Sequence, residues 1–113
     1  MQKSRHSFAV SPWVRAEAAS ALGSMARRKD LTAALASQSF EDVQAFCDGV
    51  QTLPITAAAY DLTTRWMLNF DLGLRAGDAL HAAITKLNKA QLLTCNKLLV
   101  KVGDKLGIKV LAV

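Results

Sequence analysis

The acidic residue best placed to do chemistry is Asp78. It follows Gly77 and precedes an apolar stretch with helical character, Ala79–Ile84. A carboxylate at a helix N-terminus is stabilised by the positive end of the helix dipole. Carboxylate oxygens are also ligands that Mg²⁺ and Mn²⁺ prefer. Asp78 is therefore a candidate metal ligand, although residue type and position alone favour an ordinary acid in the first turn of a helix.

Two further ionisable residues occur in predicted helices. Glu17 lies between Ala16 and Ala18, where a solvated helix face is the common interpretation. A metal role for Glu17 would require a second carboxylate close in space. His81 lies three residues after Asp78 and so shares its helix face. A metal or base role competes there with a structural histidine, and the structural interpretation has the stronger prior.

Polar side chains also follow the predicted strand Gln91–Thr94. Thr94 and Asn96 lie at its carboxyl end, which is where open α/β sheets bind ligands. Asn96 can form hydrogen bonds but carries no charge, so by itself it is a poor ligand for Mg²⁺. The two cysteines, Cys47 and Cys95, show neither metal-binding nor disulfide spacing.

The elements that must position these residues alternate between short apolar stretches and segments of helical periodicity. Strands are predicted over Ser7–Ser11, Gln51–Ile55, Gln91–Thr94 and Lys109–Val113. Helices are predicted over Trp13–Arg28, Leu31–Ala36, Phe40–Gly49, Ala57–Asn69, Asp78–Asn88 and Asn96–Leu106. The expected N-caps are Ser11, Asp30, Ser39 and Thr56, and Gly107 is expected to end the last helix. This alternation predicts βαβ units and a parallel sheet.

The bulk composition fits a single small domain over residues 1–113. Half of the chain (51%) is apolar and 20% is charged, which predicts a packed core. The net charge of +5 suits RNA or an acidic protein partner, but also an ordinary basic protein. The sequence contains no apolar run long enough to span a membrane and no signal-peptide core. A cytoplasmic location is therefore expected.

Several segments together resemble one family. Leu74–Ala83 is very similar to the core motif of VapC-type PIN domains, a loop followed by Asp-Ala-Leu-His. Leu92–Leu99 parallels the family's strand end, and Leu106–Val110 parallels its closing strand. Ala9–Glu17 resembles the second strand and the helix that carries the family's second acid, and Leu53–Ile55 fits the third strand. The resemblance implies a three-layer α/β/α fold around a short parallel sheet of about four strands.

The same resemblance implies a hydrolase: a Mg²⁺- or Mn²⁺-dependent endoribonuclease toxin of a type II toxin–antitoxin system. In the family, about four carboxylates hold the metal, which activates water for attack on a phosphodiester. Glu17 matches the second acid and Asp78 the third, whereas Asn96 stands where the fourth, an Asp, is found. His81 and Thr94 would line the site. The implied partners are an RNA substrate, a cognate antitoxin and a second copy in a homodimer.

The family's first acid lies on an N-terminal strand that precedes two helices. Met1–His6 contains no Asp and no apolar run, so we expect an N-terminally truncated domain without that first strand. Since that strand is central in the family, its absence predicts two half-sheets with unpaired inner edges. The alternative function is then an inactive or impaired PIN remnant that only binds an antitoxin or another protein. A gene fragment or a misplaced start codon is a third interpretation.

Overall fold

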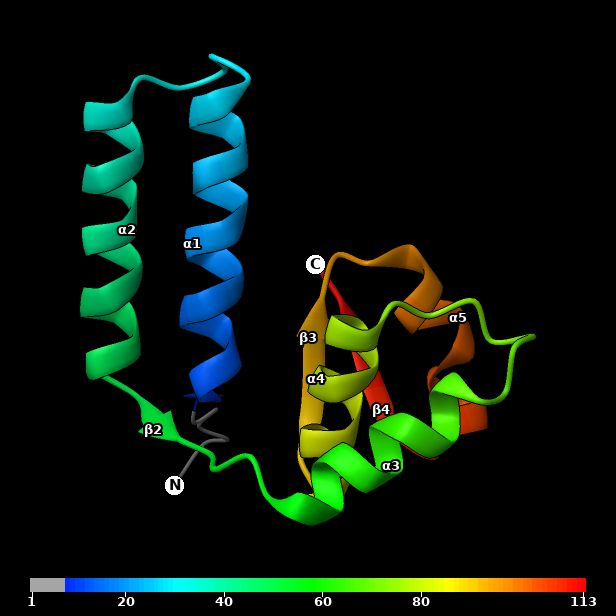
Figure 1. Ribbon diagram of the computed structural model, residues 1–113. Helices are drawn as coiled ribbons and strands as arrows, with labels where there is room; N and C mark the ends of the chain where they lie inside the picture. The colour runs from blue at the N-terminus through cyan, green and yellow to red at the C-terminus, as the bar shows by residue number, and fades with distance from the viewer. Residues whose placement is uncertain (1–7) are drawn as a thin grey trace. The chain divides into compact units, whose positions relative to one another are not determined.

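The computed structural model describes residues 8–113. These residues form five helices and four short strands, which fall into two units, Met1–Leu53 and Pro54–Val113 (Figure 1). The first unit contains β1 (Ala9–Val10), α1 (Pro12–Arg27), α2 (Ala33–Asp48) and β2 (Gln51–Thr52). The second contains α3 (Ala57–Met67), α4 (Ala76–Leu87), β3 (Gln91–Thr94), α5 (Lys97–Leu106) and β4 (Lys109–Ala112).

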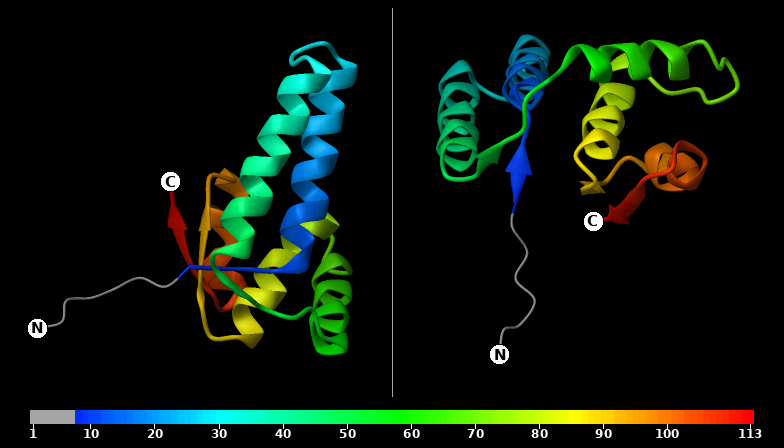
Figure 2. Two further views of the ribbon diagram at one scale, coloured as in Figure 1. Left: turned by 90° about the vertical axis from the view of Figure 1, so that its left-hand side faces the viewer. Right: turned by 90° about the horizontal axis from the view of Figure 1, so that it is seen from below.

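The first unit is a helical hairpin attached to a minimal sheet. Figure 2 shows α1 and α2 running side by side in opposite directions. The hairpin brings β1 and β2 into a parallel pair, with Ala9 opposite Gln51. At the start of α1, the Ser11 hydroxyl accepts a hydrogen bond from the backbone N–H of Trp13 at 3.2 Å. The predicted Ser11 cap and the start of this helix are therefore confirmed to within one residue.

The prediction of two short helices between residues 31 and 49 is wrong. One continuous helix, α2, covers this region, and Thr32 rather than Asp30 is its N-cap. The Thr32 hydroxyl accepts from Leu35 N at 3.1 Å, while the Asp30 carboxylate accepts from Arg28 Nε at 3.0 Å. No glycine or proline interrupts the segment, and its alanines favour helix. Ser39 is therefore accommodated in the helix interior instead of starting a new helix.

The second unit is organised around a βαβ arrangement. β3 and β4 pair in parallel over four positions, with Leu92 opposite Val110, and α5 connects them. Helix α4 packs on β3 and on α3. Leu92 and Val110 face the core, whereas Leu93 and Leu111 are 52% and 44% exposed. The core cluster consists of Leu72, Leu74, Ala79, Ala82, Leu99, Val102, Leu106 and Ile108.

The four predicted strands are confirmed, with shorter bounds in the first unit and with β4 ending one residue early, at Ala112. β1 ends before Ser11 because that residue is a helix cap; Ser7, its predicted first residue, lies outside the described residues. β2 ends at Thr52. Leu53 still donates to Val10 O at 2.7 Å, but Pro54 has no N–H to continue the ladder. Within residues 8–113 the strands form two separate two-stranded sheets, as the sequence predicts, while the truncation of the domain stays a prediction. No helix in this range is long and apolar enough to cross a membrane.

Candidate functional site

Asp78 lies in the first turn of α4, half-buried. The helix begins at Ala76, two residues earlier than predicted, so Gly77 is helical and does not belong to a loop. Arg75 occupies the N-cap position without a side-chain cap hydrogen bond, and its carbonyl accepts from Ala79 N at 3.0 Å. Asp78 therefore complements the positive end of the α4 dipole from inside the first turn.

Asn96 joins three parts of the second unit. Its Oδ1 atom accepts from the backbone N–H groups of Leu98 and Leu99, at 2.9 and 3.2 Å, and so caps α5. Its own backbone N–H donates to Thr94 Oγ1 at 3.0 Å, across the end of β3. Its Nδ2 atom donates to Asp78 Oδ2 at 2.9 Å. Asn96 is therefore the N-cap of α5, which begins at Lys97. The sequence had predicted Asn96 as the first residue of that helix, one position too early.

The two backbone hydrogen bonds fix which way the Asn96 amide points. Since the oxygen accepts from the start of α5, the NH₂ group must face Asp78. Sequence reasoning missed this bond, which joins residues 18 positions apart. The available signal was the high preference of Asn for N-cap positions, which ties its oxygen to the backbone and leaves its amide nitrogen to donate.

The predicted site residues are divided between the two units. Asp78, Thr94 and Asn96 are brought together in the second unit by the hydrogen bonds described above. His81 is half-buried on α4, one turn beyond Asp78. Glu17 is half-buried on α1, in the first unit. The roles assigned to Glu17 and His81 from the sequence remain predictions.

The cluster of Asp78, Thr94 and Asn96 does not by itself fit a divalent metal ion. Mg²⁺ demands near-octahedral oxygen coordination, and this cluster offers one carboxylate. One oxygen of that carboxylate already accepts an amide N–H. Across residues 8–113, no three residues among His, Cys, Asp and Glu gather in a way that could hold a metal.

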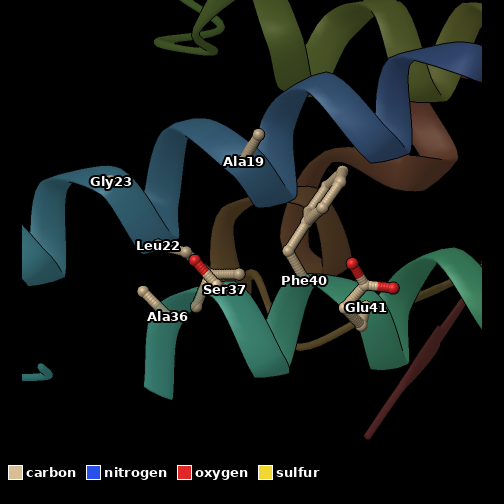
Figure 3. Close-up of a pocket in the computed structure, with 7 residues that line it drawn as sticks. All are labelled: Ala19, Leu22, Gly23, Ala36, Ser37, Phe40 and Glu41. Carbon is tan, nitrogen blue, oxygen red and sulfur yellow. The ribbon is translucent and has the colours of Figure 1, made fainter. Parts of the chain in front are cut away.

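The first unit contains a separate open groove of about 280 Å³ between α1 and α2, which the sequence did not predict (Figure 3). The side chains that line the groove are mostly small or apolar, and α2 contributes Phe40 and the carboxylate of Glu41. None of the predicted site residues lines it. The lining residues are Ala19, Leu22, Gly23, Ala36, Ser37, Phe40 and Glu41.

The fold is α/β, with five helices and short parallel sheets in the described residues, and it is compatible with a three-layer α/β/α architecture. The family model of the PIN domain matches residues 3–105, so the chain belongs to the PIN domain family. PIN domains are in general metal-dependent nucleases, often found in toxin–antitoxin pairs. The comparison with curated proteins gives no significant match, and neither does the comparison with solved structures.

Proposed function

We propose that this chain is a VapC-type PIN protein: the endoribonuclease toxin of a type II toxin–antitoxin pair, acting on RNA with Mg²⁺ or Mn²⁺ in the cytoplasm. The observation that carries the proposal is the position of Asp78. It lies in the first turn of α4 and is tied to Asn96, just past the carboxyl end of β3, the edge at which open α/β sheets hold ligands. The family match surrounds this position.

The proposal assigns the acidic chemistry to Glu17 and Asp78 together. The cluster in the second unit offers one carboxylate, Asp78, and the family resemblance assigns Glu17 as a second acid. Mg²⁺ is commonly bound through one or two carboxylates plus substrate phosphates, which fits a site completed by RNA. The family match runs across the boundary at Leu53, which supports treating the two units as one PIN domain.

A second candidate function is a catalytically impaired protein that only binds its antitoxin or another partner. The specific observation in its favour is the hydrogen bond from Asn96 to Asp78: an amide donor stands where the family has a further acidic ligand, and it engages one of the two Asp78 oxygens. The net charge of +5 suits an acidic antitoxin segment as well as RNA. A homodimer, which the family resemblance implies, is compatible with either function.

The decisive experiment measures cleavage of labelled single-stranded RNA by the full chain, with Mg²⁺ or Mn²⁺ and with EDTA. We expect Asp78→Ala to lower metal-dependent cleavage by about 100-fold or more, because even outer-shell partners of a metal contribute on that scale. Asp104→Ala is the matched control, since Asp104 is an exposed acid on α5 of the same unit. Equal cleavage by the wild type and Asp78→Ala would refute the nuclease proposal.

The binding candidate is measured separately, by size-exclusion chromatography of the wild type and Asp78→Ala with the cognate antitoxin. A complex formed equally by both proteins, without RNA cleavage by either, would establish binding without catalysis. A chain that elutes unchanged beside its antitoxin would exclude antitoxin binding as the function.

A further inference from the structure

Every polar atom of the Asn96 side chain is engaged by a group that the structure identifies. The oxygen serves the start of α5, and the nitrogen serves Asp78 on α4. Its backbone N–H is held by Thr94. No lysine or arginine among residues 8–113 forms an ion pair with Asp78, so the neutral Asn96 amide is the hydrogen-bond donor that the structure gives this carboxylate.

An aspartate in place of Asn96 would leave half of this arrangement intact. Asp and Asn are equally good N-caps, so one carboxylate oxygen could still accept from Leu98 and Leu99. The other oxygen, however, would stand about 2.9 Å from Asp78 Oδ2, where Asn96 now donates. Two carboxylates at such a distance disfavour each other's charged form and require a cation or a shared proton between them. In the wild type, the Asn96 amide donates a hydrogen bond to Asp78, so neither a cation nor a shared proton is needed between the two side chains.

We propose that Asn96 is a positioning residue that holds Asp78 with an amide hydrogen instead of a bound cation, so that the junction of α4, β3 and α5 folds without a divalent metal. This inference goes beyond the proposed function, because it concerns what stabilises the folded junction and not whether RNA is cut. It predicts that one substitution, Asn96→Asp, makes the stability of the chain depend on a divalent cation.

The test is thermal unfolding of the full chain in EDTA and in Mg²⁺, at matched ionic strength. The wild type should respond to Mg²⁺ much less than Asn96→Asp, because its folded junction has no pair of facing carboxylates for the cation to relieve. Asn96→Asp should unfold at a temperature lower by about 5 °C in EDTA, and Mg²⁺ should restore most of that loss. Because the readout is unfolding, it is independent of the RNA cleavage assay, and the two proposals can fail separately.

Two further variants keep the test sharp. The exchange variant, Asp78→Asn combined with Asn96→Asp, restores one donor and one acceptor with the polarity reversed, so its unfolding temperature should no longer respond to Mg²⁺. Asn69→Asp is the charge control, because Asn69 is exposed and its Oδ1 atom only accepts from Asp71 N. The proposal is overturned if Mg²⁺ stabilises the wild type as much as Asn96→Asp, or if the exchange variant keeps the metal response of Asn96→Asp.

Discussion

The two units are built from the same kinds of element but differ in how much they bury. Helix α1 contains no buried residue, and the buried residues in the described part of the first unit are Ser11 and Cys47. The second unit contains the apolar core cluster; α4 alone has six buried residues, of which Ala79 and Ala82 belong to that cluster. β1 and β2 pair over two positions, whereas β3 and β4 pair over four. Helices and strands of the same kind can therefore bury very different numbers of side chains in the two units.

This difference bears on the candidate site. Asp78 and Asn96 are attached to the well-packed elements, α4 and α5, which can hold side chains in a fixed geometry. In the first unit, by contrast, a polar and partly exposed contact links the side chains of α1 and α2: Arg15 donates to Gln44 and Asp48. Glu17 lies on that less buried helix. The comparison predicts that stability depends mainly on the second unit.

The largest effect is expected from truncating a core side chain of the second unit. Leu99 is 2% exposed on α5, so Leu99→Ala should lower the free energy of unfolding by about 2–5 kcal/mol through lost burial and the cavity left behind. The matched variant in the first unit is Leu22→Ala, at a half-buried position on α1, with an expected loss below about 1.5 kcal/mol. Urea unfolding followed by circular dichroism measures both. Equal losses of unfolding free energy in the two variants would contradict the proposed difference between the units.

A smaller effect is expected from adding a methyl group where the second unit is tightly packed. A Cβ at Gly103 would stand 2.6 Å from Val110 Cγ2, so Gly103→Ala should destabilise by about 1–3 kcal/mol despite the better helix propensity of Ala. A Cβ at Gly49, in the first unit, would meet its nearest atom, Phe46 O, at 3.6 Å. Gly49→Ala should therefore be nearly neutral in the same urea experiment. A stabilising Gly103→Ala would show that Val110 gives way easily and that the packing is looser than the structure indicates.

The sequence predicted local features better than long-range ones. Thr56 and Gly107 are confirmed as helix caps because their conformations depend on neighbouring residues: the Thr56 hydroxyl accepts from Ala59 N at 3.2 Å, and Gly107 has a φ of 78°. Prediction failed around Asp30 and Ser39, where two residues with cap preference compete with a continuous helix former. The resemblance to PIN domains is confirmed at the level of the family.

The candidate site was only partly predictable. The motif located Asp78, but composition and periodicity do not show that Asn96 reaches it, because that contact requires α4, β3 and α5 to be packed first. Nor could spacing relate Glu17 to Asp78, since they belong to different units. The resemblance to the family treats Asn96 as a missing acid. The structure instead gives it a positive role, as a cap and a hydrogen-bond donor.

The smallest effect is expected at the polar link of the first unit. Arg15 contacts Asp48 at 2.6 Å and Gln44 at 2.6 Å, but the Asp48 side chain is 74% exposed, so solvent screens the pair. Arg15→Ala should lower the free energy of unfolding by less than about 1 kcal/mol, and by less still at high ionic strength. Arg28→Ala is the control, because its pair with Asp30 joins residues two positions apart at the end of α1 and does not join two helices. If the loss of unfolding free energy from Arg15→Ala persists in high salt, Arg15 stabilises the hairpin through packing of its aliphatic side-chain carbons and not through its charge. The first unit would then be stabilised by more apolar contact than the exposure of its helices indicates.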